Sequence, residues 1–204
     1  MRAHGWAGKP PSDALEARAR ILSVTRDLIS SFGNTSTAEV AERLGVTRQT
    51  VYRYFPTTED LLNAAATEAV AELTTDLVKH VQAHLASTGG DAGDAAVEVL
   101  AYVFEHLRDD PALNRLLAPG RMSGTVADLT ASSSIDLGRT LIAEFGIDWE
   151  ELGWDEARQR ELVEHMLRIL QSFVLDPGDP PRSGEGLRAY LRRWLAPALR
   201  NGGA

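Results

Sequence analysis

A short stretch of this chain concentrates side chains whose chemistry suits double-stranded DNA. Those with the strongest potential to read bases are Arg48, Gln49, Tyr52 and Arg53. An arginine guanidinium can bind guanine through two hydrogen bonds, and a glutamine amide can pair with the edge of adenine. The hydroxyls of Thr47, Thr50 and Tyr52 suit phosphate groups, which position a protein without carrying sequence information. Types and spacing together indicate a surface that reads DNA.

A pattern of two short helices over residues 37–55 would position these side chains. Ala41 is small enough to let two helices cross closely, Gly45 can make the turn between them, and Val51 can fill the crossing. Phe55, four residues after Val51, points back at the first helix. This is the helix-turn-helix arrangement, whose second helix lies in the major groove of DNA.

The alternative is an ordinary amphipathic helix pair with a solvated polar face. Helix pairs separated by a glycine are common, so the spacing alone does not decide between the two interpretations. The concentration of groove-reading types on one short helix favours DNA binding.

Residues 21–62 resemble the DNA-binding domain of the tetracycline-repressor (TetR) family of bacterial regulators. The resembling stretches read ILSVTRDLISSFG, TAEVAERLGVTRQTVYRYF and PTTEDLL. The most specific part is the run VYRYF followed by proline and then EDLL, because generic helix-turn-helix proteins do not carry it. In motif terms the resemblance covers about a fifth of the chain. The rest is similar to the family only in length and helical character.

The resemblance implies a set of DNA contacts. The residues that fall where family members approach bases are Arg48, Gln49, Thr50 and Arg53, and those that fall near phosphates are Thr37, Tyr52 and Tyr54. The Thr47 hydroxyl is a further phosphate candidate and can also cap the second helix. Thr58 stands where the family often has lysine. A phosphate contact at Thr58 therefore lacks that charge and keeps a hydroxyl or a backbone N–H bond.

Composition narrows the class of protein. The chain has 204 residues, enough for one or two domains, with 44% hydrophobic and 25% charged residues, as in an ordinary globular protein. It has no cysteine, which excludes a disulfide scaffold, a thiol nucleophile and a thiolate metal site. No apolar run approaches the roughly 20 residues of a membrane helix, and no signal-peptide pattern is present. We therefore expect a cytoplasmic protein with no membrane partner.

The net charge of −8 does not by itself favour DNA binding. Residues 1–60 hold eight Lys or Arg and seven Asp or Glu, a net charge of +1, whereas residues 61–204 carry −9. Phosphate affinity must therefore come from the local placement of Arg48, Arg53 and helix N-termini. The acidic remainder is expected to weaken non-specific binding to DNA.

We expect an all-α fold of two domains. Residues 13–57 form the helix-turn-helix DNA-binding domain, and residues 58–204 form a helical domain for effector binding and dimerisation. Pairs typical of helix N-termini are Asp13 with Glu16, Ser36 with Glu39, and Thr57 with Asp60. The 3.6-residue period predicts later helices over about 58–86, 95–108, 124–145, 154–175 and 187–199, with a short one over 111–118. The first of these is long enough to act as a lever between the domains.

Residues 1–12 contain two adjacent prolines and no helical period, which predicts a flexible tail. The alternative is an arm in the minor groove of DNA that carries Arg2, His4 and Lys9. A tail this sparsely charged is more typical of a terminus that touches nothing.

The last two helices are strongly amphipathic, which indicates a dimer built from a four-helix interface. The residues expected in this interface are Leu162, Met166, Ile169, Phe173, Leu187, Leu191, Trp194 and Leu195. The alternative is that both helices simply cover the core of their own chain. A helix-turn-helix head needs a partner one DNA turn away, which favours the dimer, and the TetR resemblance implies the same.

An apolar ligand pocket is plausible in the second domain. Its candidate lining residues are Tyr102, Phe104, Leu116, Met122, Phe145, Trp149, Met166 and Phe173. Each of them is more typical of an ordinary core than of a pocket. The resemblance to TetR regulators implies that this domain binds a small effector, whose identity the residues do not reveal.

The sequence gives only weak support for metal binding or catalysis. Asp76, His80 and His84 have the i, i+4, i+8 spacing that can hold a divalent metal on one helix face. A solvated helix face explains them better, so we expect no metal site. His106 and His165 are isolated histidines, and the sequence has no Walker loop, G-x-S-x-G or G-x-G-x-x-G pattern. We expect no cofactor and no catalytic residues.

The sequence thus predicts a homodimeric TetR-like transcriptional regulator. The favoured form is a repressor that a small-molecule effector releases from a palindromic operator. One alternative is an effector-independent DNA-binding regulator or activator. The other is a helical adaptor or enzyme whose head only mimics the motif.

Overall fold

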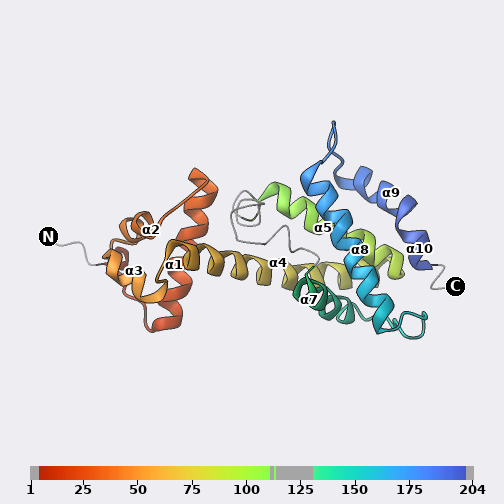
Figure 1. Ribbon diagram of the computed structural model, residues 1–204, viewed down its shortest axis with the longest axis horizontal. Coiled ribbons are helices and arrows are strands. Elements are labelled where there is room, and N and C mark those ends of the chain that lie inside the picture. Colours follow the sequence, from red (N-terminus) through yellow and green to blue (C-terminus); the bar gives the residue numbers. More distant parts are fainter. Residues whose placement is uncertain (1–4, 111–112, 114–130, 201–204) are drawn as a thin grey trace. The chain divides into compact units, whose positions relative to one another are not determined.

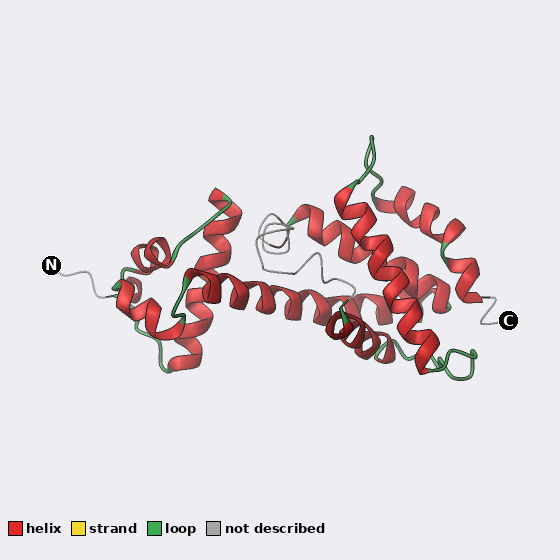
Figure 2. Cartoon of the chain, viewed as in Figure 1, coloured by secondary structure: helices red, strands yellow, loops and turns green. Residues whose placement is uncertain are grey.

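The computed structural model describes residues 5–110, 113 and 131–200, which form helices and loops without a strand (Figures 1 and 2). The elements are a 3₁₀ turn η1 (Trp6–Gly8) and the helices α1 (Ala14–Phe32), α2 (Thr37–Leu44), α3 (Arg48–Tyr54), α4 (Thr58–Thr88), α5 (Ala92–Asp109), α7 (Ser132–Ala143), α8 (Glu156–Leu175), α9 (Gly184–Trp194) and α10 (Ala196–Arg200). This confirms the expected all-α class. The chain divides into two compact units, with the division inside α4 between Ala71 and Glu72.

The first unit, here called the head, begins its helices at the residues that the sequence predicts. The Asp13 carboxylate accepts the Glu16 amide at 2.8 Å and caps α1. Ser36 and Glu39 form a reciprocal capping box at the start of α2. Such side-chain caps satisfy backbone N–H groups that have no partner within the helix. The position of each helix is therefore fixed locally.

The head extends further along the chain than the boundary at residue 57 that the sequence suggests. Leu61, Ala65 and Ala66 of α4 are at most 1% exposed and pack into the same core as α1 and α2. Their burial makes the first half of α4 part of the head. The second half of the same helix belongs to the second unit.

The second unit is organised around α5. This helix contacts α8, α9 and α10, and it is buried along most of its length (Figure 1). Its small residues, such as Ala95, Ala96 and Ala101, let the neighbouring helices approach closely. α7 completes this part of the fold by packing on α8.

Some element boundaries differ from those that the sequence predicts. The loop expected over 87–94 shrinks to residues 89–91, because Asp91 and Asp94 cap α5 reciprocally, with N–H···O distances of 3.2 and 3.0 Å. The last helix is divided at Leu195 into α9 and α10. The short helix expected over 111–118 and the start of the helix expected from 124 lie outside the described residues, apart from Leu113. No helix in the described parts of the chain is both long and apolar enough to span a membrane.

Residues 5–12 also differ from the flexible tail expected of them. Trp6 is partly buried against the core of the head. The Lys9 carbonyl accepts a hydrogen bond from the Arg20 guanidinium of α1. A single large apolar side chain can anchor a segment that has no helical period, and this is why the periodicity did not reveal the contact.

Candidate nucleic-acid interface

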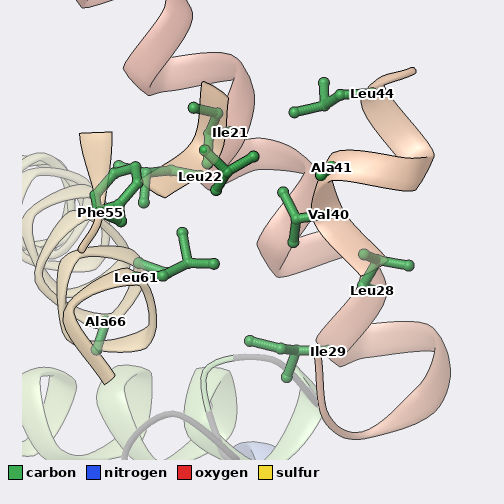
Figure 3. Close-up of a cluster of buried hydrophobic side chains, with 12 residues drawn as sticks. Ile21, Leu22, Leu28, Ile29, Val40, Ala41, Leu44, Phe55, Leu61 and Ala66 are labelled. Atoms are coloured by element: carbon green, nitrogen blue, oxygen red, sulfur yellow. The ribbon is translucent and has the colours of Figure 1, made fainter. Parts of the chain in front are cut away.

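The core of the head holds α2 and α3 against α1 and α4. Figure 3 shows buried side chains of α1, α2 and α4 gathered in one cluster with Phe55, the residue that follows α3. Val51 is the buried residue of α3 and is 0% exposed. Because α3 is only seven residues long, this single inward anchor and Phe55 after it decide which face of α3 turns outward.

The turn between α2 and α3 depends on glycine. Gly45 adopts φ 67° and ψ 29°, in the left-handed region that other residues enter only at a cost. Its amide donates to the Glu42 carbonyl at 3.0 Å, and the Val46 amide donates to Ala41 at 2.9 Å. Thr47 then caps α3 by accepting the Thr50 amide at 3.2 Å. The predicted turn and cap are both confirmed.

The outward face of α3 carries the side chains that the sequence assigns to DNA reading. Arg48 and Gln49 are exposed, and within the described parts of the chain neither side chain makes a hydrogen bond or an ion pair. Tyr52 is 46% exposed although it is aromatic. A shallow hollow of about 480 Å³ lies on this face, lined by Thr47, Gln49, Thr50, Tyr52 and Arg53. The unpartnered side-chain amide of Gln49 on this open hollow is suited to an external ligand with acceptor groups.

Arg53 differs from Arg48 because it is held in place by its neighbour. Its guanidinium carbon lies 5.1 Å from the centre of the Tyr54 ring, and its Nη2 donates to the Tyr54 hydroxyl at 3.2 Å. Tyr54 itself is half-buried and packs against the core. The Arg53 charge is therefore pre-positioned beside the exposed face, while Arg48 remains free to adapt.

Two other residues predicted to contact DNA, Thr37 and Thr58, are at least half-buried. Thr37 is only 2% exposed, so its side chain packs inside the head and cannot reach a phosphate group in this conformation. Thr58 is half-buried at the first position of α4. The resemblance implies a phosphate contact at Thr37, but Thr37 is buried at the first position of α2.

The structure describes six of the eight residues proposed to line a ligand pocket, and it places them in several different contacts. Phe104 of α5 meets Phe173 of α8 with ring centres 5.5 Å apart, and Met166, also on α8, is buried. Tyr102 instead stacks on His106 at 3.8 Å. Trp149 is buried and donates its indole N–H to the Ile142 carbonyl at 3.0 Å. Phe145 is buried as well, and Leu116 and Met122 lie outside the described residues.

Of the residues considered for a metal site, His80 joins an ion network with α5, and Asp76 forms a separate ion pair within α4. His80 Nε2 lies 3.0 Å from Oε2 of Glu98, and Asp76 pairs with Lys79 at 2.9 Å. Among the described residues, no group of three or more His, Asp or Glu is arranged to hold a metal ion. The sequence placed Asp76 and His80 on one face, but that face is tied to α5 through His80.

The buried centre of this network is Glu98 of α5, whose side chain is 3% exposed. Arg188 of α9 donates to Glu98 at 3.0 and 3.1 Å and to Glu105 at 3.0 Å. Burial by itself raises the pKa of the Glu98 carboxyl, but the hydrogen bond with His80 and the charge of Arg188 outweigh burial and leave the pKa below its ordinary value. The only sequence signal for this network is a glutamate inside the apolar run AAVEVLA.

The helices expected to dimerise use part of their apolar surface within their own chain. The residues that the protomer core already buries are Leu162, Met166, Leu187, Leu191 and Leu195. These five therefore cannot supply an exposed interface, and the alternative of core cover applies to them. Trp194 is 69% exposed, and Ile169 and Phe173 are half-buried.

Comparison with known proteins supports the interpretation of the head. Residues 21–65 match the family described as bacterial regulatory proteins of the tetR family. Over 165 residues the chain is 28% identical to the uncharacterized HTH-type transcriptional regulator Rv2250c of Mycobacterium tuberculosis (strain ATCC 25618 / H37Rv), covering 80% of this chain and 82% of that protein.

Two solved structures share the fold. The TetR family repressor AlkX from Dietzia sp. strain DQ12-45-1b superposes with a TM-score of 0.60 at 19% identity, over 95% of this chain and 99% of that one. The fatty acid degradation regulator FadR from Bacillus halodurans gives a TM-score of 0.52 at 15% identity, over 91% and 99%. At these identities the similarity concerns the fold alone.

Proposed function

We propose that this chain is a transcriptional regulator of the TetR family, a homodimeric repressor whose α3 reads a palindromic operator. The observation that carries the proposal is the exposed face of α3. Arg48 and Gln49 stand on a short helix that Val51 fixes from behind, and they have no internal partner among the described residues. The similarity to AlkX, which is a TetR family repressor, supports a repressor over an activator.

The proposed contacts divide into two kinds. Arg48 and Gln49 bind base edges in the major groove, where each base pair presents a distinct pattern of donors and acceptors. Thr47, Thr50 and Tyr52 bind phosphate groups and set the register of the head on the duplex. Arg53 and Tyr54 approach DNA as one unit because the tyrosine ring holds the guanidinium. Thr58 adds a polar contact at the start of α4.

We propose that the dimer surface lies on the exposed apolar stripe of α9, next to the stripe that is buried in the core of the protomer. Tyr190 and Trp194 are four residues apart on α9 and are 37% and 69% exposed. Phe173 of α8 meets Tyr190 edge-on with ring centres 6.1 Å apart, so the two helices share one aromatic surface. The half-buried Ile169 of α8 is proposed as a further member of the interface. Aromatic residues are enriched in protein interfaces, and a large exposed apolar patch indicates a partner.

The variant Trp194→Glu tests this surface because it places a charge where the partner would pack. We expect sedimentation to show a dimer for the native chain and a monomer for the variant at the same concentration. Arg193→Glu, which reverses a charge at the neighbouring exposed position, serves as the control and is expected to remain dimeric. A monomeric native chain would overturn the homodimer.

The proposed regulation acts through α4. This helix contributes Leu61 to the core of the head and Val81 to the core of the second unit, both 0% exposed. An effector bound by the second unit would move α4 and change the separation of the two recognition helices, and only one separation fits both half-sites. The aromatic group around Phe104 and Phe173 is the proposed location. Equal operator affinity with and without every effector candidate would leave an effector-independent regulator as the better description.

Selection of duplexes from a random pool, at two salt concentrations, tests the proposed DNA function. We expect a palindrome whose half-sites are about one helical turn apart. If nothing is recovered, the selection is repeated after unfolding and refolding have stripped any co-purified ligand. Failure to select DNA after that step would contradict the function. A regulator of this kind acts in the cytoplasm and needs no catalytic step.

A further inference from the structure

An exposed arginine of α1 lies against the end of the recognition helix. The guanidinium carbon of Arg18 is 4.4 Å from the centre of the Phe55 ring. Phe55 directly follows α3 and is 1% exposed, because its ring belongs to the core of the head. Arg18 itself is exposed, so its charge stays at the surface beside the C-terminal end of α3.

A second arginine is held in the same way at the neighbouring position. The guanidinium carbon of Arg53 lies 5.1 Å from the centre of the Tyr54 ring. Tyr54 and Phe55 are consecutive, so their Cα atoms are about 3.8 Å apart. The attraction between a cation and an aromatic face restricts where each guanidinium can move. The end of α3 therefore carries two positioned positive charges, one from α3 and one from α1.

The charge of Arg18 is not neutralised within the part of the chain that the structure describes. There its side chain makes no hydrogen bond and no ion pair. Arg20 on the same helix shows the opposite, since it pairs with Glu16 and donates to the Lys9 carbonyl. Helical side chains pair with those three or four residues away, and none of the four residues at these distances from Arg18 is acidic. Arg18 is thus available to an anion outside the chain.

The end of α3 is a suitable place to bind phosphate groups. A helix of seven residues is about 10 Å long, and the major groove is about 12 Å wide. When α3 lies in the groove, its ends are therefore close to the phosphate groups that border the groove. Because residues 1–60 carry a net charge of only +1, each unpaired cation beside α3 is a large share of the charge available for binding.

We propose that Arg18 is a phosphate-binding residue of the head, which the Phe55 ring positions beside the C-terminal end of α3. The proposal rests on the DNA-binding function above and deepens it, because it assigns part of the affinity to a helix outside the helix-turn-helix. Arg18 adds affinity without adding base preference, since phosphate groups are the same at every base pair.

Salt dependence separates this role from a structural one. Binding of the full chain to the duplex selected from the random pool is measured between about 50 and about 200 mM KCl. Arg18→Met removes the charge and keeps a flexible apolar side chain that can lie on the Phe55 ring. A merely structural loss would lower affinity by the same factor at every salt concentration and would leave the slope of log K against log salt unchanged.

We expect Arg18→Met to reduce the magnitude of that slope by about 0.9, the value for one phosphate contact. The ratio of native to variant affinity should accordingly be about 3.5-fold larger at the lower salt concentration than at the higher one. Arg18→Gln, which removes the same charge with a polar side chain, should give the same smaller slope. Neither variant should change the order of preference among duplexes with single base substitutions.

Two further variants serve as controls. Arg18→Lys keeps the charge and the ability to lie over the Phe55 ring, so we expect the native slope. Lys79→Met removes an exposed cation from the second half of α4 and makes the same change in net charge as Arg18→Met. Its slope should also equal that of the native chain. Thermal melting of each variant shows whether the head remains folded.

Three results would count against the proposal. A native slope for Arg18→Met and Arg18→Gln would overturn it and leave Arg18 with a structural contact to Phe55 alone. Equal changes of slope for Arg18→Met and Lys79→Met would overturn it as well, because net charge would then explain both. A loss that depends on the base sequence would overturn the assignment to phosphate groups.

The two levels of the proposal fail differently. If the native chain selects no duplex, the DNA-binding function is wrong. If the native chain binds a selected duplex and Arg18→Met binds it with the same slope, only the role of Arg18 is wrong.

Discussion

The head and the second unit use arginine in opposite ways. Arg48 on α3 is exposed and has no hydrogen bond or ion pair among the described residues, whereas Arg188 on α9 is 17% exposed and binds both Glu98 and Glu105. The Arg48 charge is available to a ligand outside the chain, but the Arg188 charge is satisfied inside it. The comparison shows that the partners of a charged residue, more than its type, separate a binding role from a structural one.

The same contrast holds for the aromatic residues. Tyr52 lies on the outward face of α3 with 46% of its surface exposed, and Phe104 lies inside the second unit against Phe173. The seven-residue α3 buries one residue, whereas α5 is buried along most of its length. The head therefore exposes a helix supported from behind, and the second unit encloses one.

The largest effect is expected from Arg188→Ala. Removing one partner of a buried ion pair leaves an uncompensated charge, here on Glu98, and this costs about 3 kcal/mol of unfolding free energy. Urea denaturation should show the loss, and the exposed Arg193→Ala on the same helix should differ from the native chain by less than about 0.5 kcal/mol. Unchanged stability of Arg188→Ala would mean that the ion pair is structurally unimportant.

Arg48→Ala is expected to give the complementary result. Base preference at one operator position should relax by about 1–3 kcal/mol, while the free energy of unfolding stays unchanged. Titration of the variant against duplexes with single base substitutions measures this preference. If binding weakens equally for all sequences, Arg48 contacts phosphate and the reading of bases falls to Gln49 and Arg53.

Gly45→Ala tests whether the turn positions α3. The left-handed backbone at φ 67° makes alanine unfavourable by about 1–2 kcal/mol, so we expect a less stable head with weaker operator binding. Gly186→Ala is a suitable control, because no atom lies within 4 Å of the added Cβ and φ is not positive there. A native-like melting temperature for Gly45→Ala would show that the turn tolerates another conformation.

The smallest effect concerns pH. The pKa of Glu98 lies below its ordinary value of 4.5 in the folded chain, because His80 and Arg188 outweigh the effect of burial. The charged form therefore stabilises the fold above about pH 4.5, and this contribution is lost as the pH falls through the lower folded-state pKa. The stability difference between the native chain and Glu98→Gln should be constant near neutral pH and should narrow below pH 4.5. A difference that stays constant down to pH 3 would contradict the shift.

Much of the head could be predicted from sequence because its signals are local. Ser36 and Glu39 are three residues apart, and Gly45 marks its own turn, so short-range chemistry was sufficient. The link between Glu98 and Arg188 spans 90 residues, and no local period reveals a pairing at that separation. The contact of Trp6 with the core of the head could not be predicted from sequence either, because a lone apolar residue before two prolines is typical of a flexible tail.

The two proposed binding surfaces also differ in how far the sequence predicts them. The outward face of α3 could be derived from the positions of Val51 and Phe55, which must turn inward together. The residues of the dimer surface could not be derived in this way, because two adjacent apolar stripes on α9 look equivalent in sequence. Only packing against α5 and α10 decides that Leu191 is buried and Trp194 exposed.

Hydrogen–deuterium exchange with and without the selected duplex would test the central claim, that the exposed face of α3 is the DNA-reading surface. We predict slower exchange over residues 47–54 when the duplex is bound, with unchanged exchange in α5. A duplex of scrambled sequence, matched in length and composition, should protect these residues less. Protection confined to the second unit, with none over residues 47–54, would contradict the assignment of α3 as the recognition helix.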